Sequence, residues 1–265
     1  MSVAIVTGGA SGMGLALIKS LVARGGYKGI VVADLQPPPD VSPIVSFFKS
    51  DVTSWENQTA LFKFAWEKYG RLDLVVLNAG VADLDDMYAD SEDGPQPLNL
   101  KTLAIDVNGP LYGIRQALWY MRRNPGGSSG KIVITSSSSG FYAYPINPQY
   151  CAAKHAIIGL VRSMGPFLKR ENITVNAVCP GLVRTPLVPQ AIRDAFPAEH
   201  FTPVETIIRA FHSFIYSDRS GECAEASAEQ IYYRPQPDFL DEHMELLFSG
   251  SEELWTKAYE NAKHD

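Results

Sequence analysis

Residues 2–14 read SVAIVTGGASGMG, and this stretch decides the fold. It opens with a short run rich in β-branched residues, passes through Gly8, Gly12 and Gly14, and leads into apolar residues with helical spacing up to Val22. The pattern predicts a strand, a glycine turn and a helix. Glycine at such a turn lets backbone N–H groups approach a pyrophosphate, and the positive end of the helix favours its charge.

The alternation of strand and helix continues along the chain. Further strands are expected at residues 29–33, 44–48, 72–77, 131–135, 173–178 and 230–233. Helices are expected at residues 15–22, 55–69, 100–121, 149–169 and 205–216. Continuous apolar strands separated by helices predict a Rossmann-like α/β fold, a doubly wound parallel sheet with helices on both faces. We expect one dinucleotide-binding domain at residues 1–240 and a C-terminal tail at residues 241–265, whose order is left open.

The composition is that of a globular protein with an acid excess. Of 265 residues, 46% are hydrophobic and 20% charged, which is enough to build a core. The formal net charge of −6 leaves no broad basic surface for nucleic acid or anionic lipid. Residues 83–98 contain no basic side chain and six acidic ones, Asp83, Asp85, Asp86, Asp90, Glu92 and Asp93. We interpret them as a solvated loop, with a rim that attracts a cationic substrate as the alternative.

Cysteine usage and hydropathy indicate the compartment. The three cysteines, Cys151, Cys179 and Cys223, are an odd number without metal-ligand spacing, so neither a disulfide framework nor a metal site is expected. Neither a signal peptide nor an apolar run long enough to cross a membrane is recognisable. We therefore expect a cytoplasmic protein without membrane or nucleic-acid partners.

Asp34 ends the second predicted strand, 20 residues after Gly14. A carboxylate there can accept hydrogen bonds from an adenosine ribose diol. It would repel a 2′-phosphate, and neither Ser11 nor Leu35 supplies a cation to bind one, so NAD is favoured over NADP. Asp51 has a similar position and could reach the adenine. The alternative for both carboxylates is that they merely end their strands.

Tyr150 and Lys154 are four residues apart in a predicted helix, so their side chains share one face. A lysine ammonium beside a phenol stabilises the phenolate and makes the tyrosine a usable proton acceptor. A solvent-facing pair would show the same spacing, and these two residues alone do not decide. Ser137 stands thirteen residues before Tyr150, just after the predicted strand at residues 131–135.

Together these residues make the chain resemble the short-chain dehydrogenase/reductase family. The resemblance covers residues 3–233 and rests on motifs in order: TGGASGMG, Asp34, Asp51-Val52, Asn78-Ala79-Gly80, Ser137, Tyr150 with Lys154, and Pro180-Gly181 with Thr185. Within the family, the PQYCAAKHAIIGLVRS block and the DLV and NAGV stretches are most similar to the NAD-dependent hydroxyprostaglandin dehydrogenase type. The resemblance implies an oxidoreductase that interconverts an alcohol and its ketone with NAD.

The resemblance also implies residue roles. Tyr150 would take the alcohol proton in oxidation and donate it in reduction, Lys154 would assist it and hold the nicotinamide ribose, and Ser137 would bind the reacting oxygen. Ser136, Ser138 and Ser139 stay open as alternatives to Ser137. Cofactor binding would fall to Gly8, Ser11, Gly12, Met13, Gly14, Asp34, Asp51, Val52, Asn78, Ala79, Gly80, Tyr150, Lys154, Val183 and Thr185.

One position departs from the family pattern. The family places a catalytic asparagine in a stretch like INxxGxLYG, and here residues 105–113 read IDVNGPLYG. An ungapped match puts Asp106 at that position, whereas Asn108 fits only after a slide of two residues. An aspartate could keep the family's proton relay, or its carboxylate could pair with Lys154 and weaken the effect of Lys154 on Tyr150. We expect a working but retuned relay.

The resemblance also implies a class of substrate and an oligomeric state. The segment FYAYPI at residues 141–146 lies where the family's substrate pocket is walled, so we expect a hydrophobic secondary alcohol or ketone; packing against the protein alone is the alternative. The proline-rich residues 181–201 resemble the family's mobile lid. The helices at residues 100–121 and 149–169, which carry Ala117, Trp119, Ala152, Ala156 and Gly159, match those of a family dimer bundle, so a homodimer or homotetramer is expected.

Two other classes of function remain open on the sequence. A nucleotide-binding sensor or scaffold without turnover would keep the cofactor motifs but lose catalysis, and Asp106 is the only residue that favours it. A family member recruited to a non-redox cyclisation or dehydration would keep the same site residues. Fold alone does not distinguish these functions.

Overall fold

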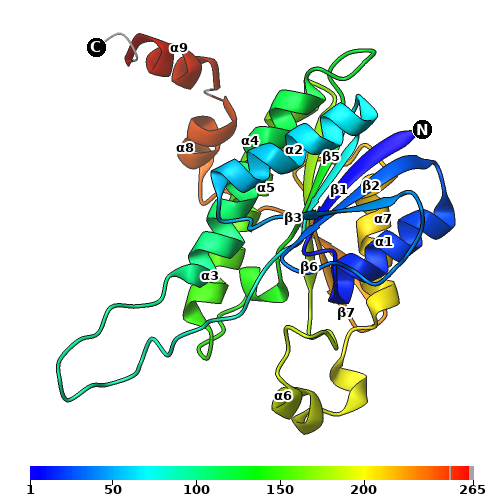
Figure 1. The fold of residues 1–265 in the computed structure, drawn as a ribbon. Coiled ribbons are helices and arrows are strands. Elements are labelled where there is room, and N and C mark those ends of the chain that lie inside the picture. Colours follow the sequence, from blue (N-terminus) through cyan, green and yellow to red (C-terminus); the bar gives the residue numbers. More distant parts are fainter. Residues whose placement is uncertain (251, 263–265) are drawn as a thin grey trace. The chain divides into compact units, whose positions relative to one another are not determined.

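The computed structural model describes residues 1–250 and 252–262. These residues divide into two compact units, unit 1 up to Arg234 and unit 2 from Pro235 onward. Unit 1 is built on one sheet (Figure 1). Its strands among the described residues are β1 Ser2–Thr7, β2 Tyr27–Asp34, β3 Val45–Lys49, β4 Leu74–Leu77, β5 Gly130–Thr135, β6 Ile173–Pro180, β7 Cys223–Ser227 and β8 Gln230–Arg234. They lie in the order β3-β2-β1-β4-β5-β6-β7-β8, all parallel except β8, which runs antiparallel to β7.

Helices cover both faces of this sheet (Figure 1). On one face α1 (Gly12–Arg24) and α7 (Val204–Ile215) pack on the sheet, and on the other α2 (Trp55–Tyr69), α4 (Gly109–Met121) and α5 (Pro148–Lys169) do so. Strand β1 shows why: Ala4 and Val6 join the core under α1 and α7, while Ile5 between them joins the other core. The doubly wound fold predicted from the apolar strands is confirmed.

The strand order reverses beside β1, and this point defines the ligand-binding edge. Strand β1 lies between β2 and β4, with Thr7 in register with Ala33 and Leu77. The loops after these three strands therefore meet at one end of the sheet. In open α/β sheets such a reversal opens a crevice at the carboxyl ends of the strands, where ligands bind.

The predicted helix at residues 100–121 is not uniform. It consists of α3 (Lys101–Leu103), the π-helical turn η1 (Ala104–Asn108) and α4. The Gly109 N–H donates to the carbonyl of Ala104, five residues back, which widens the helix at η1. The expectation of one regular α-helix was therefore wrong for these five residues.

Strand β7 was not predicted. Its sequence, CAEAS, is short and carries a charged residue, so it lacks the apolar run that identified the other strands. It pairs in parallel with the backbone edge of β6, with Ala177 in register with Cys223. The expected strand at residues 230–233 is β8, one residue longer, and it forms a hairpin with β7.

The segment between β6 and α7 carries little regular structure: α6 (Gln190–Ala195) and the short turn η3 (Ala198–His200). Unit 2 contains α8 (Glu242–Glu245), the π turn η4 (Leu246–Gly250) and α9 (Glu252–Ala262), and the Asp241 carboxylate caps α8 by accepting from Met244 N at 2.9 Å. Residues 251 and 263–265 of the expected tail lie outside the described residues. Within the described ranges, no helix is long and apolar enough to cross a membrane.

Candidate active site

The glycine turn after β1 brings backbone N–H groups to the ligand-binding edge. Gly8 and Gly12 have φ of 63° and 51°, a region that side chains other than glycine rarely adopt. A Cβ at Gly14 would lie 2.3 Å from the Gly8 carbonyl oxygen. Among the described residues no side chain caps α1, and its first turn has no acidic residue. The helix therefore presents free N–H groups and a positive end, which suits a pyrophosphate.

Asp34 lies beside this turn. Its Oδ2 accepts from Ala10 N at 3.0 Å and its Oδ1 accepts from Leu35 N at 2.7 Å, so the carboxylate is fixed against the glycine turn. Oδ1 also accepts from Gln36 N at 3.4 Å, whereas Oδ2 keeps further acceptor capacity, and the side chain is only partly buried. Asp34 is thus placed to accept from a ribose diol.

A cleft of about 460 Å³ runs along this edge. The structure gathers most of the predicted cofactor residues around it: Gly8, Ser11, Gly12, Met13, Asp34, Asp51, Val52, Asn78, Ala79, Gly80 and Thr185. Gly14 stands behind the turn, and Val183 faces the neighbouring cavity. Lys101, an exposed cation that the sequence reasoning missed, also lines the cleft. No motif marked it, because only the fold brings the start of α3 to this edge.

Asn78 locks three strand ends together. Its amide Nδ2 donates to the carbonyls of Thr7 at 3.3 Å and Gly8 at 3.1 Å, and its Oδ1 accepts from Thr135 Oγ1 at 3.0 Å. The Asn78 N–H donates to Thr7 Oγ1 at 3.0 Å. The ends of β1, β4 and β5 therefore form one rigid floor beneath the cleft.

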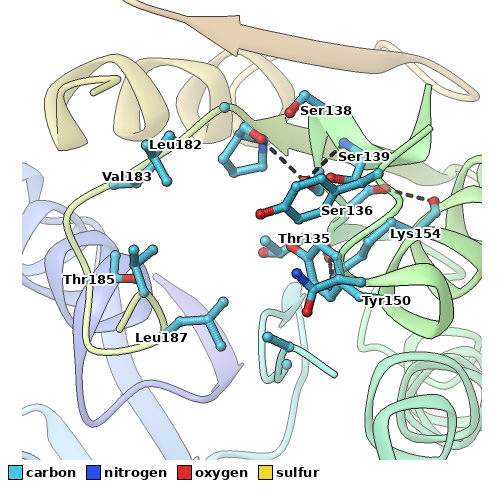
Figure 2. A pocket seen from close by; sticks show the side chains of 18 of the residues that line it. Thr135, Ser136, Ser138, Ser139, Tyr150, Lys154, Leu182, Val183, Thr185 and Leu187 are labelled. Carbon is cyan, nitrogen blue, oxygen red and sulfur yellow. Dashed lines mark hydrogen bonds between the residues drawn. The ribbon is translucent and has the colours of Figure 1, made fainter. Parts of the chain in front are cut away.

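A second cavity of about 400 Å³ adjoins the cofactor cleft. Both are lined by Met13, Asn78, Gly80, Thr185 and Leu187, so they share a wall. Figure 2 shows Tyr150, Lys154 and Ser136 on one side of this cavity, with Val183, Thr185 and Leu187 across from them. Ser137 lines it too. A molecule in the second cavity would therefore contact both the predicted catalytic residues and a cofactor in the cleft.

Lys154 is held in place by buried polar groups. Its Nζ lies 2.9 Å from Asp106 Oδ2, donates to the Thr135 carbonyl at 3.1 Å, and stands 5.2 Å from the centre of the Tyr150 ring. Burial alone would lower the pKa of Lys154, but the negative charge of Asp106 and interaction with Tyr150 outweigh it and hold that pKa above its ordinary value of 10.5. An ammonium has three donors, so one remains for a further acceptor such as a ribose hydroxyl.

Asp106 sits within the π turn η1 and is almost fully buried. Its Oδ1 accepts from Val81 N at 2.9 Å, while its Oδ2 faces Lys154. Asn108, the alternative from the shifted match, is exposed. The structure thus brings Asp106 rather than Asn108 to Lys154, and it does so by a direct ion pair.

The serines after β5 differ in their hydrogen-bond partners. Ser136 Oγ donates to the Lys154 carbonyl at 2.9 Å and so fastens the loop to α5 (Figure 2). Ser137 Oγ accepts from Ser139 N at 3.1 Å and lies 3.5 Å from the Pro180 carbonyl. All four serines line the cavity, but the hydroxyl of Ser136 is committed to structure.

The predicted aromatic wall is only partly realised. Tyr142 and Tyr144 line the cavity with Ala143, whereas Phe141 packs against the core and Ile146 is largely exposed. The Tyr142 hydroxyl accepts from Arg234 Nη1 at 2.7 Å. Apolar side chains of the segment at residues 181–201 complete the lining: Leu182, Val183, Leu187, Val188, Ile192 and Phe196. The cavity suits an apolar ligand with a polar group at Tyr150.

Comparison with known proteins places this site in a family. The model of the short chain dehydrogenase family matches residues 2–195. A short-chain dehydrogenase/reductase of Penicillium rubens, prx6, is 32% identical over 244 residues, which cover 86% of this chain and 81% of that protein. The chain belongs to the short-chain dehydrogenase family, whose members are oxidoreductases that use a nicotinamide cofactor. The resemblance inferred from the motifs is confirmed.

One further relative and one solved structure of similar fold differ in the cofactor that their names give. The 15-hydroxyprostaglandin dehydrogenase [NAD(+)] of Rattus norvegicus is 31% identical over 197 residues, 70% of each chain. A solved structure titled ElxO with NADP bound superimposes with a TM-score of 0.72 at 21% identity, covering 85% of this chain and 96% of that one. The second likeness supports the fold alone.

Proposed function

We propose that this protein interconverts a hydrophobic secondary alcohol and its ketone with NAD. The observation that carries the proposal is the position of Tyr150: its ring stands over the buried Lys154–Asp106 pair, on the cavity that shares a wall with the cofactor cleft. Tyr150 would thus contact a substrate in the cavity, next to a cofactor in the adjoining cleft.

The residues present fit a dinucleotide. The glycine turn is packed so tightly that a Cβ at Gly14 would lie 2.3 Å from the Gly8 carbonyl oxygen, and α1 begins beside it without a side-chain cap. Gly8, Ser11, Gly12, Met13, Gly14, Val52, Asn78, Ala79, Gly80, Val183 and Thr185 would hold the cofactor, with Asp51 at the adenine. The nicotinamide ring, when bound, accepts or supplies a hydride.

Four side chains would move the proton and orient the substrate. In oxidation Tyr150 takes the proton of the alcohol hydroxyl, and in reduction its phenol returns it to the ketone oxygen. Lys154 stabilises the phenolate and offers its third N–H to the nicotinamide ribose. Ser137 donates to the reacting oxygen, and Asp106 keeps Lys154 charged and in place.

Asp34 supports a preference for NAD over NADP. Its carboxylate at the glycine turn would accept from the ribose diol and repel a 2′-phosphate. Lys101 is the one cation in the cleft lining as described, and it opposes this preference. We expect Asp34 to prevail, because it is fixed by backbone N–H groups while Lys101 is exposed. Comparing turnover with NAD and NADP at equal concentration tests this.

Formation of NADH at 340 nm tests the proposed reaction. NAD and a panel of hydrophobic secondary alcohols are offered to the wild type, to Tyr150→Phe and to Tyr144→Phe. Tyr144 lines the same cavity, so its variant controls for the loss of a pocket hydroxyl. We expect Tyr150→Phe to lower kcat at least about hundredfold, the range of general acid–base catalysis, and Tyr144→Phe to change it far less.

The same experiment separates the alternatives. Equal turnover by wild type and Tyr150→Phe contradicts the proposed role of Tyr150. NAD binding without turnover on any alcohol or ketone favours the sensor or scaffold, whereas consumption of a candidate substrate without any change in NADH favours the non-redox reaction.

We also propose a homodimer or homotetramer formed through α4 and α5. Trp119 on α4 is half exposed, and Ala152 and Gly159 are exposed on α5. Ala117, named with them from the sequence, is instead buried in the core. The catalytic domain is proposed at residues 1–240, with residues 181–201 as a lid that orders over bound cofactor and residues 241–265 as a tail.

A further inference from the structure

We propose that Asp83 is a positioning residue for Tyr150, acting from the acidic loop on the start of α5; this rests on the proposed role of Tyr150. The Asp83 Oδ1 accepts from the Tyr150 N–H at 2.6 Å, and its Oδ2 accepts from the Gln149 N–H at 3.0 Å. In return, Asp83 N donates to Asn147 Oδ1 at 3.2 Å. Asp83 thus satisfies backbone donors at the start of α5, and Asn147, just before α5, satisfies the backbone donor of Asp83.

This arrangement replaces the usual cap of a helix. Asn147 precedes α5, but its side chain does not cap the helix, and the first turn contains no acidic residue. The first N–H groups of a helix lack partners within it, and a carboxylate near them is stabilising. Asp83 supplies that carboxylate from 67 residues earlier in the chain. A sequence pattern cannot show it, because a capping box is recognised only within one segment.

The contact links three parts of the site. Gly80 lines both the cleft and the cavity, and Val81 N is held by Asp106, the partner of Lys154. Two residues further on, Asp83 holds the backbone of Tyr150. Residues 80–83 therefore tie the cofactor side, the Lys154–Asp106 pair and Tyr150 to one short segment. A displacement of about 1 Å at a reacting group can cost roughly a hundredfold in rate.

The Asp83 carboxylate acts on Tyr150 through the backbone N–H of that residue. It also lies at the positive end of α5, where a negative charge stabilises the start of the helix. Removing it should therefore loosen the backbone at Tyr150 while the Lys154–Asp106 pair stays in place.

The neighbouring carboxylates offer a matched control. Asp85 Oδ2 accepts from Asn99 N at 2.9 Å and Asp86 Oδ1 accepts from Tyr88 N at 2.9 Å, contacts that stay within the loop. Asp85→Ala thus removes the same charge and the same kind of hydrogen bond without touching α5. The change in kcat of Asp85→Ala therefore measures the effect of loosening the loop alone.

The test compares Asp83→Ala, Asp83→Asn and Asp85→Ala in the full chain by kcat and by KM for NAD. We expect Asp83→Ala to lower kcat roughly tenfold or more with KM for NAD nearly unchanged. Asp83→Asn keeps one acceptor and should recover part of kcat. Asp85→Ala should match the wild type. A kcat for Asp83→Ala within twofold of wild type, or an equal loss in Asp85→Ala, overturns the proposal.

A second readout needs no substrate. Amide hydrogen exchange at Gln149 and Tyr150 should be slow in the wild type and in Asp85→Ala, and faster in Asp83→Ala. Equal exchange in all three proteins contradicts the cap itself. If Tyr150→Phe keeps full turnover while Asp83→Ala loses exchange protection, the proposed role of Tyr150 fails and the cap stands, so the two failures are distinguishable.

Discussion

Lys154 shows how one buried residue combines opposing physical effects. Burial disfavours its charge, whereas Asp106 at 2.9 Å and interaction with Tyr150 favour it, and the net result is a raised pKa. The stability that this ionised pair contributes is complete below the ordinary lysine pKa of 10.5 and is lost as pH rises through the higher folded-state pKa. The ammonium is therefore secure throughout the neutral range, where the proposed reaction needs it.

Asp106→Asn should retune the reaction. Without the carboxylate, burial dominates and the pKa of Lys154 falls, so activity is lost at lower pH on the alkaline side. We expect kcat/KM against pH to move by more than about 0.3 unit, where one unit corresponds to about 1.4 kcal/mol. Asp90→Asn, in an exposed loop, is the control. A curve that moves less than this argues against retuning by Asp106.

At the scale of single elements, the glycine turn between β1 and α1 has the tightest requirements. Gly8 needs a positive φ, and a Cβ there would also lie 2.7 Å from the Ala79 Cα. Gly14 has an ordinary backbone conformation but packs against the Gly8 carbonyl. The two glycines are thus required for different reasons, conformation and close approach.

Gly14→Ala should weaken NAD binding while the fold persists. The added Cβ would lie 2.3 Å from the Gly8 oxygen, so the turn has to shift and its N–H groups leave their positions around the pyrophosphate. We expect the Kd for NAD, measured by calorimetry, to rise at least about tenfold, or about 1.4 kcal/mol. Gly159→Ala, whose Cβ would have no neighbour within 4 Å, is the control. An unchanged Kd in Gly14→Ala would mean that the turn does not carry the pyrophosphate.

At the scale of the whole molecule, the sheet brings distant segments to one edge. The residues around Lys154 come from η1, from the end of β5 and from α5, three elements separated in the chain. The strand order places their ends together, and Asn78 fixes them. Within unit 1, Trp119 on α4 and Gly159 on α5 are exposed.

Gly159→Arg tests the proposed assembly. The position is open, so an arginine should be accommodated in the single chain, but two such charges would be buried in a contact formed by α5 from each copy. We expect sedimentation to show a larger share of monomer at the same concentration, with the unfolding temperature of the monomer little changed. An unchanged distribution contradicts an interface at this face. Lys19→Arg, on α1, is the control.

The π turn η1 and the strand β7 could not be predicted from the sequence. Residues 104–108 have ordinary helical spacing, and the π turn arises because Asp106 is held by Val81 and Lys154, which lie outside the helix. Strand β7 has no apolar run and forms because β6 offers an unpaired backbone edge. In both cases contacts between distant segments outweigh local preference.

The sequence by itself determined the alternating strands and helices, the glycine turn and the residues that mark the family, because each depends on local spacing and burial pattern. Only the tertiary structure decided that Asp106 rather than Asn108 meets Lys154, that Lys101 enters the cofactor cleft, and that Asp83 caps the helix of Tyr150. The hydrogen bonds of Asp106 and Asp83 join residues 25 to 67 positions apart, and no local pattern of the sequence states which side chains meet. They are set by the strand order of the sheet, which brings those segments to one edge.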